Sequence, residues 1–92
     1  MSNSLINNTK VCYFCGRQNN LHKHHIFGGV GRRSLSEEYG AWVYLCPEHH
    51  TGPKGVHFDK ARDQFLKREC QRAWEETRTR DEFREVFGKS YL

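Results

Sequence analysis

Two short stretches of this 92-residue chain hold five of its six histidines, and a cysteine pair precedes them. The first stretch runs from Leu21 to Gly29, and the second runs from Leu45 to His50. Imidazole and thiolate are the preferred ligands of borderline-soft divalent metals. Clusters of both groups at short spacing therefore predict metal chemistry before any other chemistry.

Two pairs of potential ligands have the spacing of a structural zinc site. Two residues separate Cys12 from Cys15, so both sulfurs can reach one ion, and Gly16 permits the tight turn behind them. Cys46 and His49 repeat this spacing and complete a closed set of three thiolates and one imidazole. A structural Zn²⁺ would also stabilise a domain too small to bury a large core.

The alternative interpretation of the first pair is a redox Cys-x-x-Cys or two unpaired thiols. The zinc interpretation is favoured because the second pair has zinc-site spacing and no βαβ pattern surrounds the first. Cys70 is an alternative fourth ligand, but it lies far away in a predicted helix, so His49 is preferred.

Composition and charge narrow the class of protein. Fifteen Lys and Arg against eleven Asp and Glu give a net charge of +4, a mild attraction toward nucleic acid. The chain shows neither the apolar pattern of a signal peptide nor a run long enough to span a membrane. We therefore expect a soluble cytoplasmic protein without a membrane partner, in which four cysteines favour metal binding over two disulfides.

The chain divides into an arm, one domain and a tail. Residues 1 to 10 are rich in Ser and Asn and predict a flexible arm, residues 11 to 88 a single domain, and residues 89 to 92 a tail. Within the domain, strands are expected over 21 to 27 and 41 to 45, joined as a hairpin. Between them, residues 31 to 40 predict a polar loop.

Helices are expected in the second half of the chain. Cys46-Pro47 opens a short helix, since Pro is tolerated at the first helical position. From about residue 57, apolar residues recur at three- and four-residue steps and predict a core-facing helix. The stripe consists of Phe58, Ala61, Phe65, Leu66, Cys70, Ala73, Trp74 and Thr77. Thr79 and Glu82 form a capping box before a second helix, which carries Phe83, Val86 and Phe87 and ends at Gly88. These aromatic residues are expected to pack in the core rather than to stack on bases.

Together, the motifs Cys-x2-Cys, His-His-Ile and Leu-Cys-x2-His-His over residues 12 to 57 resemble those of the HNH endonucleases. This is the ββα-metal or His-Me finger family, here in the zinc-stapled form often carried by phages. The resemblance covers about half of the chain. It implies an α+β fold: a small ββα-metal core, stapled by a structural zinc and followed by C-terminal helices.

The resemblance also implies roles for the histidines. His24 would be a ligand of a catalytic metal, His25 the general base, and His50 a second ligand from the helix. An imidazole with a pKa near ~6.5 can accept a proton from water at neutral pH. His57 can fold back as a further ligand or a phosphate contact. His22 lies on the same side of the strand as His24 and is open to three interpretations: ligand, phosphate contact or exposed residue.

One family residue has no counterpart in this chain. The middle Asn of the family, which holds the catalytic loop in place, is expected near Gly40 or Ala41. No Asn stands there, which leaves that role unassigned.

Basic residues near the histidines predict contacts with phosphates. The candidates are Lys23, Arg32, Arg33 and Lys54. The remaining basic residues alternate with acids on the long helix and are expected to be ordinary solvated surface: Lys60, Arg62, Lys67, Arg68 and Arg72. Nothing in this pattern reads base edges, so little sequence specificity is expected.

Two functions follow from these observations. The first is a metal-dependent DNA endonuclease or nickase with Mg²⁺, Mn²⁺, Ni²⁺ or Zn²⁺ as catalytic metal, and the family resemblance implies that it is phage-encoded and acts in the host cytoplasm. A larger phage protein is a candidate partner that would direct it. The second is a zinc-stapled DNA-binding or protein-binding module that has the fold without the cleavage activity.

Overall fold

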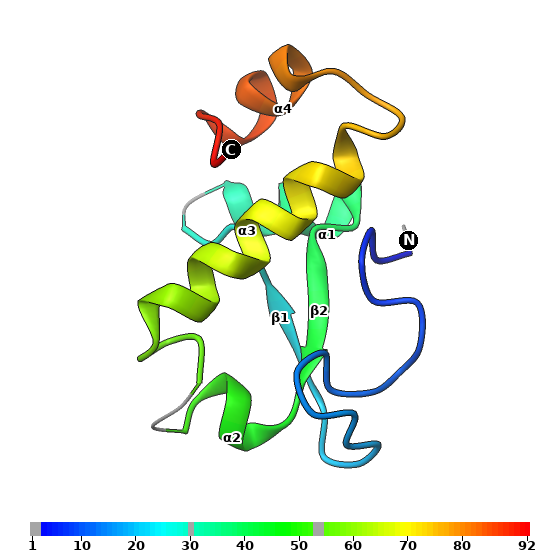
Figure 1. Cartoon of the computed structure of the whole chain (residues 1–92), viewed down its shortest axis with the longest axis vertical. Helices are drawn as coiled ribbons and strands as arrows, with labels where there is room; N and C mark the ends of the chain where they lie inside the picture. Colours follow the sequence, from blue (N-terminus) through cyan, green and yellow to red (C-terminus); the bar gives the residue numbers. More distant parts are fainter. Residues whose placement is uncertain (1–2, 30, 53–54) are drawn as a thin grey trace.

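A two-stranded antiparallel sheet lies at the centre of the fold, as the computed structural model shows for residues 3–29, 31–52 and 55–92. The strands are β1 (His22–His25) and β2 (Trp42–Leu45). The helices in this part of the chain are α1 (Arg32–Tyr39), α2 (Pro47–His50), α3 (Lys60–Trp74) and α4 (Arg80–Phe87). The long helix α3 crosses the hairpin, with α2 near one end of the molecule and α4 at the other (Figure 1). The expected α+β class is confirmed.

The hairpin places neighbouring histidines in a defined register. His24 pairs with Val43 and His25 pairs with Trp42. β1 ends at His25, although the Ile26 N–H still donates to the carbonyl of Ala41, the residue before β2, at 2.9 Å. Both strands are therefore shorter than the sequence predicted, and the end of β1 frees the backbone to turn just after the histidine pair.

The polar loop predicted over residues 31 to 40 is a helix, so that prediction is wrong. Gly31 and Gly40, with φ of 79° and 77°, flank α1 in the left-handed conformation that glycine adopts without strain. Ser36 is fully buried, while Leu35 and Tyr39 are half-buried against the core. The helix was missed because its apolar face is narrow and its stability comes from tertiary packing.

The expected flexible arm is also corrected, because residues 3–10 pack along β2. The Asn7 side chain accepts a hydrogen bond from the Tyr44 N–H at 2.7 Å, and the Ser4 hydroxyl donates to the Trp42 carbonyl. Ser4 and Asn7 are both buried. A two-stranded sheet leaves an edge of unpaired backbone groups, and this segment supplies their partners.

The helices predicted in the second half are present, but α3 begins three residues after the predicted start near residue 57 and ends three residues before Thr77. Asp59 caps α3 by accepting from the Arg62 N–H at 3.2 Å. Thr79 and Glu82 form the predicted capping box, and Gly88 ends α4 with φ of 92°. These features involve residues three to nine positions apart, so they could be inferred from sequence alone.

Only part of the predicted apolar stripe faces the core. Leu66, Cys70 and Trp74 are fully buried, but Phe58 is 72% exposed and Phe65 39% exposed. Phe58 precedes α3 and Phe65 lies near its start, which is the end of the helix that extends beyond the hairpin in Figure 1. The prediction of core packing is therefore wrong for these two phenylalanines.

The aromatic core closes against the chain end. The rings of Phe27 and Phe87 stack at 4.2 Å between centroids, and Phe83 packs beside both. Tyr91 lies 5.5 Å from the Phe27 ring, and its N–H donates to Gln71 at 2.7 Å. Residues 89 to 92 are thus more than the predicted loose tail, because Tyr91 covers the core.

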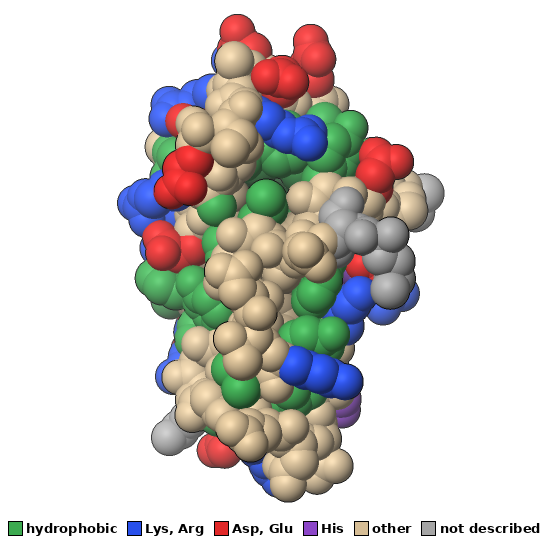
Figure 2. Space-filling view, turned by 90° about the vertical axis from the view of Figure 1, so that its right-hand side faces the viewer, with side chains coloured by type: hydrophobic (Ala, Val, Ile, Leu, Met, Phe, Trp, Pro, Cys, Tyr) green, Lys and Arg blue, Asp and Glu red, His purple; other side chains and the backbone are tan. Residues whose placement is uncertain are grey.

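Charge is unevenly spread over the surface. On the face seen in Figure 2, acidic side chains gather at the α4 end, and histidine is visible only at one edge. The histidine-rich part of the molecule therefore opens onto another side. No helix in the described ranges combines the length and apolar character needed to cross a membrane.

Candidate metal centres

Three thiols and one imidazole lie close together, two of the thiols in the turn that precedes β1. Their ligand atoms all lie within 4.8 Å of one another, and the residues are Cys12, Cys15, Cys46 and His49. The Gly16 N–H donates to the Cys12 carbonyl at 2.8 Å, with Gly16 at φ 79°, and this turn brings the first two sulfurs together. Cys46 is the N-cap of α2, so His49 follows within the first turn of the helix.

The distances within this Cys₃His cluster fit one tetrahedral ion. With metal–sulfur bonds of about 2.3 Å and metal–nitrogen bonds of about 2.05 Å, ligands of a tetrahedral zinc would be separated by about 3.8 Å for two sulfurs and about 3.6 Å for sulfur and nitrogen. The Cys15 and Cys46 sulfurs are 3.7 Å apart, and His49 Nδ1 is 3.7 Å and 3.2 Å from the Cys12 and Cys46 sulfurs. The four residues can therefore hold a metal ion.

The electrostatics of the turn favour a thiolate at one position. Burial raises the pKa of Cys12, but N–H groups of Cys46, Cys15 and Phe14 outweigh it, so the pKa of Cys12 lies below its ordinary value. For Cys15, the N–H of Arg17 lowers the pKa, but burial and the two neighbouring thiols outweigh it and the pKa is raised. Thiolate is the metal-binding form, and a bound cation would stabilise all three.

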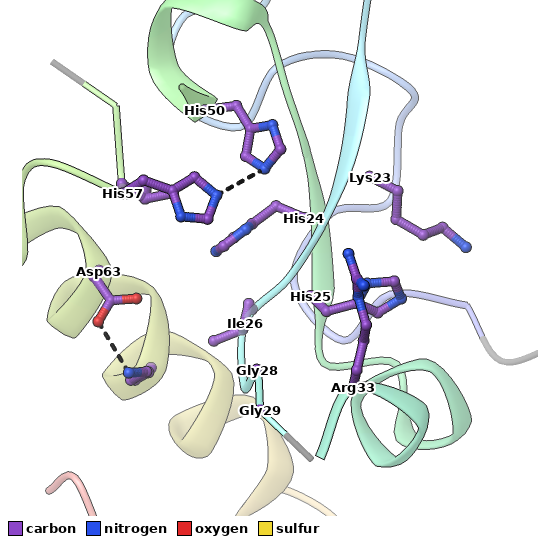
Figure 3. Close-up of a pocket in the computed structure, with 12 residues that line it drawn as sticks. Lys23, His24, His25, Ile26, Gly28, Gly29, Arg33, His50, His57 and Asp63 are labelled. Atoms are coloured by element: carbon purple, nitrogen blue, oxygen red, sulfur yellow. Dashed lines mark hydrogen bonds and ion pairs between the residues drawn. The ribbon is translucent and has the colours of Figure 1, made fainter. Parts of the chain in front are cut away.

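A second cluster gathers His24 from β1, His50 from the end of α2 and His57 from the segment before α3. Their ligand atoms also lie within 4.8 Å of one another. His50 Nε2 is 3.2 Å from His57 Nε2, and the three rings converge in Figure 3. The Nε2 of His24 is buried without a hydrogen-bond partner.

The chemistry of this three-histidine cluster also fits a metal ion. Two nitrogens bound to one tetrahedral ion at about 2.05 Å would stand about 3.3 Å apart, close to the 3.2 Å seen here. Burial lowers the pKa of His24 to about 3, and burial, followed by the charges of His57 and His22, lowers the pKa of His50. Both imidazoles are therefore neutral at pH 7, which is the form that binds metal. An ion here would also satisfy the unpaired Nε2 of His24.

His25 lies beside this cluster rather than in it. Figure 3 shows His24 directed toward His50 and His57, while His25 extends to the other side of β1. Both side chains nevertheless line one pocket of about 630 Å³, because the strand ends at His25. Burial lowers the pKa of His25, and Glu37, whose Oε1 lies 3.9 Å from His25 Nε2, partly raises it again.

The predicted phosphate contacts do not all line the pocket. Lys23 and Arg33 line the pocket, and Lys23 is also paired with Glu37 at 3.1 Å. Arg32 is not among the pocket-lining residues, and its guanidinium lies beside Gly88 at the end of α4 instead. Lys54 lies outside the described residues.

Two residues of α3 that were not among the predicted site residues line the pocket. Asp63 and Lys67 line its wall and form an ion pair of 2.9 Å. We expected Lys67 to be ordinary solvated surface. Their i, i+4 spacing predicts the pair, but which way that face of the helix points depends on how α3 packs over the hairpin.

Comparison with protein-family models, with curated proteins and with solved structures gave no match. One cluster offers three thiols and one imidazole and the other offers three imidazoles, and a fourth histidine and several charged groups line the pocket beside the second cluster.

Proposed function

We propose that the protein is a metal-dependent DNA endonuclease or nickase of the HNH type, with a ββα-metal core formed by β1, β2 and α2. The observation that carries the proposal is the convergence of His24, His50 and His57 on one point, with His25 on the wall of the same pocket. A metal site next to a histidine that can accept a proton is the minimum that phosphodiester hydrolysis requires.

The two clusters would have separate tasks. The Cys₃His cluster is closed, with four protein ligands at tetrahedral spacing, as structural zinc sites are. The three-histidine cluster has only three ligands and borders a pocket, so it leaves positions for water and a phosphate oxygen. We therefore assign Zn²⁺ to the first cluster and the catalytic ion to the second.

The donor set bears on the identity of the catalytic ion. Imidazole suits Zn²⁺ and Ni²⁺, whereas Mg²⁺ is held by carboxylates and carbonyl oxygens. Three imidazoles and no carboxylate among the three ligand residues favour Ni²⁺ or Zn²⁺ over Mg²⁺ and Mn²⁺. When bound, such an ion supplies Lewis-acid stabilisation of the charge that develops on the phosphate and on the leaving 3′ oxygen.

His25 would act as the general base. Its lowered pKa keeps the imidazole neutral at pH 7, so a ring nitrogen can accept a proton from water. The water oxygen then forms the new bond to phosphorus, and the bond to the 3′ oxygen breaks. Glu37, whose Oε1 lies 3.9 Å from His25 Nε2, would stabilise the imidazolium that results.

Ser36 supports the loop that carries this base. The Ser36 hydroxyl donates to the Phe27 carbonyl at 2.8 Å and accepts from the Phe27 N–H at 3.2 Å, two residues after His25. At Gly40, where the family's Asn is expected, a side chain would collide with the backbone of Asn3. We assign the loop-holding role of the missing Asn to Ser36.

The substrate assignment rests on charge. Lys23 and Arg33 on one wall and Lys67 on the other face the pocket, as a phosphate backbone requires. Contacts of this kind carry little sequence information, so we propose low sequence specificity. A phage origin, action in the host cytoplasm and guidance by a larger phage protein belong to the same proposal and rest on the family resemblance alone.

The test is a plasmid-nicking assay with each of Mg²⁺, Mn²⁺, Ni²⁺ and Zn²⁺. Wild-type protein is expected to convert supercoiled DNA to open-circle or linear forms. His25→Ala is expected to keep its zinc and its DNA affinity and to lose cleavage by roughly two or more orders of magnitude. Cleavage that persists in His25→Ala would contradict the mechanism.

A DNA-binding or protein-binding module without cleavage activity is the second candidate. It is favoured because the His25 side chain points away from the metal cluster: His24 and His25 leave β1 on opposite sides (Figure 3). The same assay separates the two functions: wild-type protein that binds DNA and nicks none with any of the four metals is a binding module.

A further inference from the structure

We propose that His22 positions His50 for metal binding by accepting a hydrogen bond from the Nδ1–H of His50. His22 is not a ligand in this arrangement but acts through His50. The inference rests on the three-histidine metal site proposed above, and it assigns a role to a histidine of β1 that is neither a cluster member nor the proposed base.

The two ring nitrogens of His50 face different neighbours. Its Nε2 lies 3.2 Å from His57 Nε2, inside the cluster, and its Nδ1 lies 3.0 Å from His22 Nδ1, outside it. The lone-pair directions of the two nitrogens of one imidazole diverge, so a single ion cannot bind both. If Nε2 binds the ion, the ring proton must be on Nδ1.

That proton needs an acceptor, and His22 provides one. A separation of 3.0 Å is an ordinary hydrogen-bond length, and the two rings meet edge-on at 72° with centroids 5.2 Å apart. His22 accepts at Nδ1 only if its own proton is on Nε2. Its ring is exposed, so this N–H can bond to water.

The positions of the partners explain why such a contact is needed. His50 is the last residue of a four-residue helix and is only half-buried, so the helix alone does not fix its ring. His22 and His24 stand two apart on β1 and therefore project to the same side. One strand thus supplies both a ligand of the ion and the group that orients a second ligand. Partners of this kind change metal affinity by about 10- to 100-fold.

The test compares His22→Asn with His22→Leu. Asn Oδ1 stands at the same branch position as His Nδ1 and retains an acceptor, whereas Leu has the shape of Asn without it. His22 is exposed, so both variants are expected to fold, with melting curves close to that of the wild type. Proteins that hold zinc at the Cys₃His cluster only are titrated with Co²⁺. The spectrum of Co²⁺ bound by histidines alone lacks the thiolate charge-transfer band that Co²⁺ would show at the Cys₃His cluster.

We expect His22→Leu to bind Co²⁺ about 10- to 100-fold more weakly than the wild type and His22→Asn to recover most of the loss. Imidazole ¹⁵N NMR, recorded without the second ion, should show His50 in the Nδ1–H form in the wild type and in His22→Asn, but a mixture of tautomers in His22→Leu.

Four outcomes would overturn the inference. Equal Co²⁺ affinity in all three proteins, or an equal loss of Co²⁺ affinity in both variants, overturns the role of His22 but not the metal site. If His22→Leu binds one ion per chain fewer than the wild type, His22 is a metal ligand rather than a positioning residue. Wild-type protein that binds no Co²⁺ at the histidines overturns the proposed metal site as well.

Discussion

Removal of the Cys46 thiolate should unfold the protein, because this sulfur touches two other members of the Cys₃His cluster. It lies 3.2 Å from His49 Nδ1 and 3.7 Å from the Cys15 sulfur, and Cys46 is 1% exposed. We expect Cys46→Ala to lose the structural ion and cooperative folding together.

The magnitude follows from the size of the chain. At roughly 0.05–0.15 kcal/mol per residue, 92 residues have a free energy of unfolding of about 5–14 kcal/mol. Structural zinc contributes about 10–16 kcal/mol in small zinc domains at pH 7. The metal term is thus as large as the whole stability, and a site reduced to three ligands cannot retain enough of it.

The assay combines elemental analysis with thermal melting. Wild-type protein purified without chelator should carry about one tightly held zinc per chain, and Cys46→Ala none. The matched control is Cys70→Ala, which removes a buried sulfur outside the cluster and should cost about 1 kcal/mol while the zinc is kept. A Cys46→Ala protein that keeps its zinc and melts within a few degrees of the wild type would refute the assignment.

Three further predictions concern the loop, the buried thiol and the substrate. Ser36→Ala should lower the plasmid-nicking rate more than DNA affinity, because it frees the Phe27 backbone near His25 while leaving the pocket cations in place; equal rates in the variant and the wild type would contradict this. Burial raises the pKa of Cys70 to about 12. As the pH rises, the unfolded chain therefore loses the thiol proton before the folded protein does, and the free energy of unfolding falls above about pH 9 by about 1.4 kcal/mol per pH unit. Urea titrations at pH 7.5 and pH 10 should therefore show the cost of Cys70→Ala shrinking at the higher pH, and a constant cost would be the contrary result. DNA affinity should fall steeply with salt and vary little between sequences, as filter-binding competition can measure, whereas strong preference for one site would contradict phosphate-only contact.

The parts of the fold that could be predicted are those that depend on neighbouring residues. The capping box of Thr79 and Glu82 and the turn at Gly88 are local, and both are present as predicted. Cys46-Pro47 opens α2 for the same reason. The Cys₃His set could also be proposed from spacing, since residues three apart in a turn reach one ion, whereas the pairing of His24 with His50 was implied only by the family resemblance.

The failures have a common physical cause. The helix α1 and the ordered segment 3–10 both depend on surfaces that exist only after the hairpin forms, which a local pattern cannot reveal. Phe58 fits the helical stripe but lies before the first residue of α3 and is exposed. A periodic pattern predicts which face of a helix is apolar but not how far its neighbours extend.

The sequence by itself determined which residue types could bind metal and how they group along the chain, because ligand identity and short spacing are local properties. Only the tertiary structure decided that His57 joins His24 and His50, that His22 meets the opposite nitrogen of His50, and that Lys67 lines the pocket while Arg32 does not. Those relations depend on how α2 and α3 pack against the hairpin, and that packing depends on contacts between residues far apart in the chain.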